Sequence, residues 1–484
     1  MKVGIIGAGI AGLAASVRMA CKGHEVSVFE ANAYAGGKLS AFELGRYRFD
    51  AGPSLFTMPQ YVDELFELAN ENPRDHFNYE QLKTVCHYFW EDDTRLNAYA
   101  DQEAFAQETE QVLGVPAKRL LGILKESKRK YELTGRTFLE KSLHRLDTWL
   151  TKEVARAIIQ IPTLDLFRSM NRANERIAKH PKLVQLFNRF ATYNGSNPYK
   201  APGLLNIIPH FEHHFGAYFP RGGMHAITEQ IYELAKRKGV QFHFNSKVDQ
   251  IVVEHKKAQG LVVKGKQHAF DRVICNMDIF HAYRKLLSDQ KAPERILRQP
   301  KSTSALIFYW GIKKSFPALG VHNIFFSEDY QKEFAELEAG RVFNDPTVYI
   351  NITSKKEPKD APEGCENWFT MINVPPNLGQ DWEKWIPTIK KNSLQKLSRI
   401  LKMDIAPLIE EEAVLDPIQI EAKTASHLGS LYGTSSNNRM AAFLRHPNFS
   451  SKIKELYFCG GSVHPGGGIP LCLLSAKIID DLTN

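Results

Sequence analysis

The chain has 484 residues, which predicts either two large domains or about three smaller ones. Apolar residues make up 43% and charged residues 24%, a composition that excludes disordered, collagen-like and coiled-coil proteins. No run of about eighteen apolar residues occurs, so we expect no membrane-spanning helix. The six cysteines are scattered without a CxxC pair, which argues against a zinc site or a disulfide scaffold and fits a reducing cytosol.

The positive charge is concentrated in one segment. The whole chain has a net charge of +8, from 62 basic and 54 acidic residues. Residues 111–190 alone hold 17 Lys and Arg against 7 Asp and Glu, so the remainder is close to neutral. A basic block of this kind can face nucleic acid or an anionic membrane surface, and it can equally be a solvated helical face.

The hydrophobic pattern predicts a strand, a helix and a second strand at the N-terminus. These elements cover residues 2–7, 10–22 and 25–30. Residues from about 60 to 190 are expected to be mainly helical. The helices predicted there cover residues 61–71, 102–113, 117–133 and 152–159.

A second α/β stretch follows, and the C-terminus repeats the pattern of the N-terminus. We predict a helix ending near residue 238 and strands at 241–244, 250–255, 271–276, 305–312, 323–326, 348–353 and 368–374. A helix at 382–402, a strand at 456–459 and a helix at 469–482 complete the chain. The two ends of the chain share a strand–glycine–helix pattern, and the segments between them have a different pattern. This arrangement favours two interleaved domains over two domains in series.

The first strand leads into a glycine-rich motif, Gly7-Ala8-Gly9-Ile10-Ala11-Gly12. Gly7 permits the tight turn, Gly9 lets a pyrophosphate approach the backbone, and Gly12 lets the helix pack close to the sheet. The helix N-terminus offers free N–H groups to phosphates. Glu30, at the end of the second strand, can accept both hydroxyls of an adenosine ribose. The motif therefore predicts dinucleotide binding, and an acidic residue at position 30 argues against a 2′-phosphate.

Two further motifs favour FAD over NAD. Gly36-Gly37-Lys38 and Arg48-Phe49-Asp50-Ala51-Gly52-Pro53 follow the ribose-binding strand, where a longer dinucleotide needs the chain to fold back along its pyrophosphate. Near the C-terminus stands Gly460-Gly461-Ser462-Val463-His464-Pro465-Gly466-Gly467-Gly468-Ile469-Pro470. Its glycines can lie flat against a planar ring, and the positive end of the following helix would stabilise the negative charge of a reduced flavin.

In this order the three motifs resemble the flavin-dependent amine oxidase and carotenoid desaturase superfamily. The segment from Leu456 to Pro470 is similar to the bacterial phytoene-desaturase type of carotenoid desaturase. Phytoene desaturases usually continue with Gly-Val after the Ile-Pro pair, whereas this chain continues with Leu471-Cys472. That departure looks more like the subgroup that desaturates C3–C4 of hydroxylated or methoxylated carotenoids.

The resemblance implies an α/β fold in which a Rossmann-type FAD-binding domain is interleaved with a mixed-sheet and helical substrate domain. The FAD domain would comprise residues 1–65, 216–285 and 425–484, and the substrate and membrane-contact domain residues 66–215 and 286–424. FAD would be bound non-covalently, with Val248 touching the adenine through its backbone. The implied cofactor-binding residues are Gly7, Ala8, Gly9, Ile10, Ala11, Gly12, Glu30, Ala31, Gly37, Lys38, Gly52, Pro53, Ser54, Val248, Asn276, Gly461, Gly468, Ile469 and Pro470.

The chemistry that the resemblance implies is loss of a hydride to the flavin and of a proton from the neighbouring carbon. The expected substrate is a 1-hydroxylated acyclic or monocyclic carotenoid, and the expected electron acceptor is oxygen or a quinone. Asp147, His144 and Glu140 are candidate bases, among which the sequence does not choose. A phytoene desaturase, a carotenoid isomerase, a flavin amine oxidase and a flavoprotein that only binds carotenoid remain alternatives.

A carotenoid dissolves in membranes, so we expect a peripheral protein on the cytoplasmic side that uses the basic region 111–190, without a nucleic-acid partner. The side chains predicted to insert into lipid are Leu120, Leu121, Ile123, Leu124, Ile158 and Ile159. Strands 305–312 and 368–374 would form the floor of an apolar tunnel. His210, His213 and His214 lie close in sequence, but without carboxylate or cysteine support we expect packing there and no metal.

Overall fold

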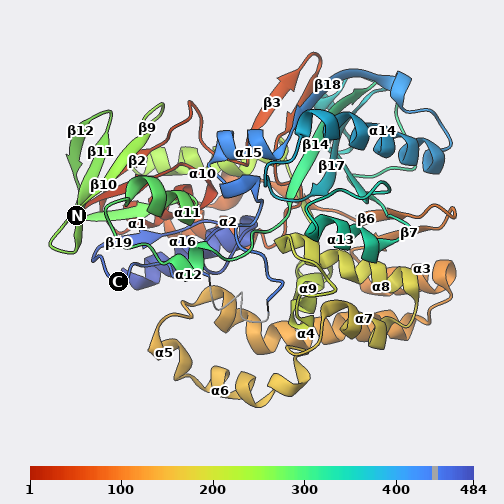
Figure 1. Cartoon of the computed structure of the whole chain (residues 1–484), viewed down its shortest axis with the longest axis horizontal. Coiled ribbons are helices and arrows are strands. Elements are labelled where there is room, and N and C mark those ends of the chain that lie inside the picture. The colour runs from red at the N-terminus through yellow and green to blue at the C-terminus, as the bar shows by residue number, and fades with distance from the viewer. Residues whose placement is uncertain (439–444, 484) are drawn as a thin grey trace.

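A parallel sheet of five strands brings both ends of the chain together. The computed structural model describes residues 1–438 and 445–483 (Figure 1). In spatial order the strands are β19 (Leu456–Phe458), β13 (Arg272–Cys275), β1 (Lys2–Ile6), β2 (Glu25–Phe29) and β9 (Gln241–His243). Helices α1 (Ile10–Cys21), α10 (His225–Arg237) and α16 (Ile469–Leu482) share a hydrophobic core with one face of the sheet. The other face packs on the antiparallel sheet of β10 (Val248–Glu254), β11 (Lys257–Val263) and β12 (Lys266–Ala269).

A mixed sheet of seven strands forms the second part of the molecule. In spatial order its strands are β18 (Ile409–Leu415), β14 (Ser304–Ile312), β17 (Glu366–Val374), β16 (Val348–Ile352), β15 (His322–Phe325), β6 (Thr84–Phe89) and β7 (Arg95–Tyr99). Alternate side chains such as Phe308, Trp310 and Trp368 pack with α14 (Trp382–Leu401) on one face. The residues between them therefore point to the opposite face, toward the parallel sheet.

A group of helices occupies the lower part of the molecule in Figure 1. They are α3 (Gln102–Leu113), α4 (Ala117–Glu140), α5 (Leu146–Trp149), α6 (Lys152–Ile159), α7 (Met170–Ala178), α8 (Pro181–Asn188) and α9 (Ile208–His213). Helices α5 and α6 lie at the lower left edge of this group. Short helices elsewhere are α2 (Gln60–Leu68), α11 (Ile279–His281), α12 (Glu294–Leu297), α13 (Tyr330–Glu338) and α15 (Pro417–Thr424). In the described part of the chain, no helix has both the length and the apolar character needed to cross a membrane.

The predicted α/β fold with an interleaved second sheet is confirmed, but the helical prediction for residues 60–190 is wrong over residues 79–99. That segment forms β5 (Tyr79–Gln81), β6 and β7. β6 pairs in parallel with β15, more than two hundred residues away, and a local helical pattern cannot reveal such a partner. The hairpin of β3 (Ala41–Leu44) and β4 (Tyr47–Asp50) and strand β18 were also missed.

The two sheets draw on the segments that the sequence assigned to two domains. All strands of the parallel sheet lie within 1–65, 216–285 and 425–484, and all strands of the seven-stranded sheet within 66–215 and 286–424. The pair of β5 with β8 (Tyr218–Pro220) crosses the predicted boundary. The division at these residues stays a prediction.

Candidate functional site

One cavity of about 1450 Å³ extends from the parallel sheet to the seven-stranded sheet. The residues predicted to bind the cofactor line it, with the exception of Ala8 and Gly12, which are buried in the glycine-rich turn. Motifs separated by more than four hundred residues thus share one wall. The parallel sheet makes this possible because β1 and β19 flank the same strand, β13.

Glu30 joins the glycine-rich turn to the second strand. Its Oε2 accepts a hydrogen bond of 2.7 Å from the backbone N–H of Ala8, and its Oε1 accepts one of 2.8 Å from Asn32. A carboxylate has about four lone-pair sites, so it can still accept hydroxyl donors from a ligand in the cavity. Val248 begins β10 beside it, where the N–H of Ser246 donates to the Glu30 carbonyl at 2.8 Å.

Asn276 fixes the turn from the opposite side. With its amide oxygen directed at the turn, the side chain accepts hydrogen bonds from the N–H groups of Gly9 at 3.3 Å and Gly12 at 3.2 Å. A Cβ at position 12 would lie 2.1 Å from the carbonyl oxygen of Gly7. Helix α1 therefore approaches the sheet to a distance that only glycine allows.

Two helices open onto the cavity without a side-chain cap among the described residues. Helix α1 follows Gly9 and helix α16 follows Gly468, and neither N-cap contributes a side chain. Unpaired N–H groups at a helix start favour anions or electron-rich ring atoms. Gly468 has a φ of +105°, and a Cβ there would meet no described atom within 4 Å although the residue lines the cavity. This open space fits a flat ring placed against the backbone.

Lys38 supplies a partly buried cation between the two glycine-rich segments. Its Nζ donates to the carbonyl oxygen of Leu431 at 2.9 Å. Burial lowers the pKa of its ammonium group, while the charge of Asp278 raises it. A Cβ at Gly52 would lie 1.9 Å from the Lys38 carbonyl oxygen, so these segments pack at backbone contact.

The far half of the cavity has a floor built from the seven-stranded sheet. Six adjacent strands, from β18 to β6, contribute residues that line or adjoin it, including Ile307 and Tyr309 from β14 and Phe369 and Met371 from β17. Five gaps between strands of about 4.8 Å each give a floor about 24 Å long. This length and the apolar character of most of the floor suit a long hydrocarbon chain.

A polar cluster interrupts this apolar wall, and the sequence analysis did not find it. The Nη2 of Arg189 lies 2.8 Å from Glu212 Oε1, and its Nη1 donates to the Tyr193 hydroxyl at 2.9 Å. Nearby on the sheet, the Nδ1 of His322 lies 2.7 Å from the Tyr349 hydroxyl. All five side chains line the cavity. Arg189 and Tyr193 share the short 3₁₀ helix Arg189–Asn194, whereas Glu212, His322 and Tyr349 come from α9, β15 and β16, so no local motif unites the five. The one available signal was a charged residue close to the apolar residues Phe187 and Phe190.

The three candidate bases do not lie on the described wall of the cavity. Glu140 accepts a hydrogen bond of 3.2 Å from the Tyr61 hydroxyl. Asp147 is paired with Arg145 at the surface, and the ring of His144 packs edge-on against His464. None of the three lines the cavity, although Leu143 between them does, and the role of each as a base stays a prediction.

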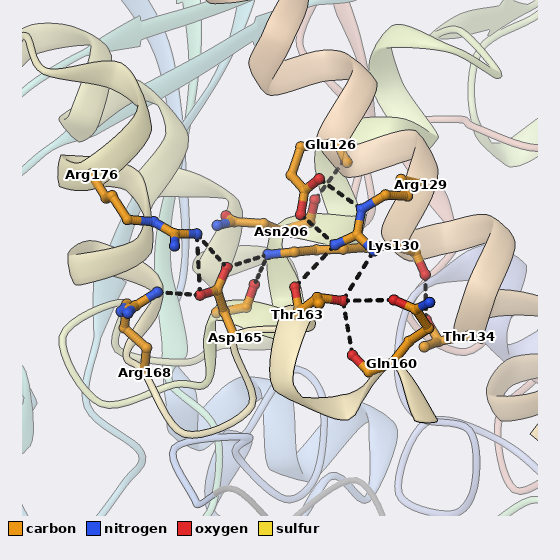
Figure 2. A network of polar contacts seen from close by, with 12 residues as sticks. Glu126, Arg129, Lys130, Thr134, Gln160, Thr163, Asp165, Arg168, Arg176 and Asn206 are labelled. Carbon is orange, nitrogen blue, oxygen red and sulfur yellow. Dashed lines mark hydrogen bonds and ion pairs between the residues drawn. The ribbon is translucent and has the colours of Figure 1, made fainter. Parts of the chain in front are cut away.

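The basic region proves to be partly internal. Lys130 is fully buried, and its Nζ contacts Asp165 Oδ2 at 2.9 Å and the Gly203 carbonyl oxygen at 3.1 Å. Figure 2 shows Arg168 and Arg176 directed at the same carboxylate. Arg189 is also buried. Lys130 and Arg189 therefore cannot face an external polyanion, whereas the side chains of Arg168 and Arg176 remain 42% and 56% exposed.

The predicted insertion side chains fall into two groups. Leu120, Ile123 and Leu124 are buried in the helical core and Leu121 packs against it, so their prediction as lipid contacts is wrong. They face inward because α4 packs on α3 and α9. Ile158 and Ile159 on α6 are exposed, as are other large apolar side chains of the same segment, namely Leu146, Trp149, Leu150 and Phe167.

The histidines noted in the sequence are packed among aromatic rings. His210 stacks on His214 with ring centroids 4.3 Å apart, and His213 stacks on Phe105 at 5.1 Å. Burial lowers the pKa of both His210 and His213 to about 4. Among the described residues, a different trio brings potential ligand atoms within 4.8 Å of one another: His281, Glu421 and His427.

Comparison with known proteins gives consistent results. The profile of the family "Flavin containing amine oxidoreductase" matches residues 10–478. A 1-hydroxycarotenoid 3,4-desaturase from Flavobacterium sp. (strain P99-3) is 54% identical over 99% of this chain and 98% of that protein. A 4,4′-diapolycopene oxygenase from Methylomonas sp. is 31% identical over 99% and 97% of the two chains. A solved structure of putrescine oxidase shares the fold, with a TM-score of 0.65 at 12% identity over 100% of this chain and 97% of that chain.

Proposed function

Because the chain belongs to the flavin containing amine oxidoreductase family, we propose that it is an FAD-dependent carotenoid desaturase. The reaction is introduction of a C3–C4 double bond into a 1-hydroxylated acyclic or monocyclic carotenoid. The observation that carries this proposal is the 54% identity, over nearly the full length of both chains, to a 1-hydroxycarotenoid 3,4-desaturase. The long apolar cavity that continues from the glycine-rich turn supports a polyene substrate.

The residues present fit FAD. Glu30 would hold the ribose, the start of α1 the pyrophosphate, and the open space at Gly468 the flavin ring. When bound, FAD would accept the hydride, and with it the two electrons, that the substrate loses, while the second hydrogen leaves as a proton. The uncapped start of α16 places partial positive charge beside the ring site, which stabilises an electron-rich ring.

The protein itself would position the substrate and exclude water from the cavity. The floor residues of β14 and β17 hold an extended apolar chain along the sheet, and the α4 residues Phe138 and Leu139 close the cavity on the helical side. Exclusion of water protects a cationic polyene from hydration, and alignment of the reacting carbons lowers the entropic part of the barrier.

We propose non-covalent binding of FAD. Three cysteines line the cavity, and all are poor attachment points because burial raises the pKa of their thiols. The pKa of Cys472 rises to about 11, that of Cys86 to about 12, and that of Cys459 well above its ordinary value. A thiol with so high a pKa is rarely the reactive thiolate. Denaturation in acid should therefore release all the flavin into the supernatant, and flavin that stays with the precipitate would contradict this.

We further propose a peripheral membrane contact through α5 and α6. Leu146, Leu150 and Ile159 are 85%, 86% and 76% exposed, and Figure 1 places both helices at one edge of the molecule. The flanking residues Leu143 and Leu166 line the cavity, so this edge connects the surface with the substrate site. The helices would lie on the cytoplasmic leaflet, and oxygen or a quinone would reoxidise the flavin.

A liposome assay with the purified FAD-loaded protein tests the desaturase proposal. The panel contains phytoene, lycopene, a 1-hydroxylated acyclic carotenoid and a hydroxylated monocyclic carotenoid, and absorption spectra follow the products. A red shift confined to the hydroxylated substrates is expected, because each added conjugated double bond moves absorption to longer wavelength. A shift that starts from phytoene would replace the proposal with phytoene desaturation, and no shift with any of the four would favour amine oxidation or carotenoid binding without turnover.

A further inference from the structure

His322 carries an unsatisfied polar atom beside an otherwise apolar floor. The residue is 4% exposed and lines the cavity, and its Nε2 has no hydrogen-bond partner among the described residues. A buried polar group without a partner is destabilising unless a ligand satisfies it. The other ring nitrogen, Nδ1, contacts the Tyr349 hydroxyl and the Asn351 side chain, and these contacts fix the orientation of the ring.

The hydrogen bonds of His322 define which of its nitrogens bears the proton. The amide nitrogen of Asn351 donates to the Val321 carbonyl oxygen at 2.9 Å and to His322 Nδ1 at 3.3 Å. Because a carbonyl only accepts, this end of the amide is the NH₂ group, which cannot accept from the ring. We assign Nδ1 of His322 as the acceptor, to which the Tyr349 hydroxyl at 2.7 Å can also donate. Burial lowers the pKa of His322 to about 4, so the ring is neutral near pH 7. The single ring proton therefore sits on Nε2, which makes Nε2 a donor that lacks an acceptor in the described chain.

We propose that His322, oriented by Tyr349 and Asn351, donates a hydrogen bond to the C1 hydroxyl oxygen of the carotenoid and selects hydroxylated end groups. This inference rests on the proposed desaturase function. It makes His322 a specificity-determining residue and gives the polar cluster a role in substrate recognition. A hydrocarbon end group would leave the donor unsatisfied, and discrimination of this kind is strong in sites built to pair with a substrate hydroxyl.

The polar cluster lies where it could place the reacting C3–C4 bond of the substrate close to the flavin site. The Tyr349 hydroxyl lies 2.7 Å from His322 Nδ1 and 2.8 Å from Ser54 Oγ. Ser54 follows Gly52 and Pro53, which are assigned to the wall of the flavin site. In the substrate, C1 is joined to C3 through C2 alone. A residue that holds the C1 oxygen thus also fixes C3 and C4 close to that wall.

The other polar groups of the cluster are compatible with a hydroxyl. Arg189 and Glu212 are paired at 2.8 Å, and Tyr193 bonds to both, so their charges are already balanced within the chain. They line the same part of the cavity and influence the pKa of His322. A polar but neutralised wall accepts an alcohol group and gives no reason to bind an ion.

The test compares two substrates that differ only in the hydroxyl. The kcat/KM of the FAD-loaded protein is measured in liposomes with a 1-hydroxylated acyclic carotenoid and with the hydrocarbon of the same polyene chain. We expect the native protein to prefer the hydroxylated substrate by at least about tenfold. His322→Phe should abolish this preference by lowering kcat/KM for the hydroxylated substrate alone. His322→Gln, which keeps an N–H donor at a similar reach, should restore most of it.

Flavin content and melting temperature show whether each variant is folded. Tyr349→Phe should weaken the preference, whereas the matched change Tyr47→Phe, at a buried tyrosine outside the cavity whose hydroxyl bonds Glu410, should leave it intact. An unchanged preference in folded, FAD-loaded His322→Phe would overturn the inference while the desaturase proposal stands; if that variant does not fold, an unchanged preference in Tyr349→Phe would do the same. Failure of the native protein to desaturate either substrate would overturn the desaturase proposal itself.

Discussion

The carboxylate of Glu30 accepts a hydrogen bond of 2.7 Å from the backbone N–H of Ala8. This contact joins the end of β2 to the turn between β1 and α1, so the group assigned to the ribose also shapes the turn assigned to the pyrophosphate. The two oxygens of Glu30 have different partners, since the second accepts a hydrogen bond from the backbone N–H of Asn32. We therefore expect cofactor binding and the local fold to depend on the same charge.

Substitution Glu30→Gln should weaken FAD binding by about 10- to 100-fold, because charge-assisted hydrogen bonds each contribute about 1.5–3 kcal/mol. Titration of the apoprotein with FAD, followed by flavin fluorescence, measures the change. Glu25→Gln at the exposed start of the same strand is the matched control and should bind FAD normally. Equal affinities for the two variants would contradict the assignment of Glu30.

Substitution Gly12→Ala should yield protein that is purified largely without FAD. The added Cβ would lie 2.1 Å from the Gly7 carbonyl oxygen, so α1 must move away from the turn. The ratio of flavin to protein absorbance measures the loss. Gly122→Ala provides the control, because a Cβ there meets no described atom within 4 Å and alanine is favoured inside α4 by about 0.5–1 kcal/mol. That variant should keep its flavin and melt slightly higher.

Substitution Asp165→Asn should lower the free energy of unfolding by about 3–5 kcal/mol, because it leaves Lys130 charged and unpaired in the interior. Figure 2 shows both residues at the centre of the network between α4 and α7. Glu126→Gln removes the partner of Arg129 at the surface of the same helix and should cost about 1 kcal/mol or less. Urea unfolding of both variants gives the comparison, and similar losses for the two would refute the distinction.

Replacement of Leu146, Leu150 and Ile159 together by serine should reduce binding to anionic liposomes by at least about 100-fold. Each buried side chain of this size contributes about 1.5–3 kcal/mol on leaving water. Co-sedimentation measures binding, and FAD content should not change. Leu378→Ser removes a side chain that is also exposed, at 65%, but lies after β17, and binding of this variant should match that of the native protein. Undiminished binding of the triple variant would exclude α5 and α6 as the contact.

Acidification should destabilise the protein between pH 6.5 and pH 4. Burial lowers the pKa of His213 and His446 to about 4, from an ordinary value of 6.5. In this window the unfolded chain binds protons that the folded chain does not, so the free energy of unfolding falls as the pH falls. Each such histidine contributes up to about 1.4 kcal/mol per pH unit. Urea unfolding at pH 7 and pH 5 measures the slope, and His213→Phe should reduce it.

The nucleotide half of the site was predictable because its requirements are local. Each requirement is recognisable in a short stretch of sequence: a glycine in a tight turn, a glycine under a helix, and an acidic residue at the end of a strand. Residues 7–12, Glu30 and the glycines before Pro470 were all recognisable in this way, and they define one wall of the cavity. The family resemblance drawn from them agrees with the match over residues 10–478.

The substrate half could not be predicted, since its residues meet through pairings between distant segments. The parallel pairing of β6 with β15 brings the Cys86 region beside His322, and α9 brings Glu212 to Arg189. Likewise, the sequence showed a basic region but not that Lys130 and Arg189 point inward, because burial depends on what packs against a helix.

The sequence by itself determined the dinucleotide turn, the α/β character and the family, because backbone geometry at glycines and the alternation of apolar residues are set by neighbours in the chain. Only the tertiary structure decided which polar side chains face the polyene, which apolar ones face solvent, and that His322 keeps an unpaired donor beside the cavity. Those outcomes depend on contacts across hundreds of residues, where the free energy of burial rather than local preference selects the arrangement.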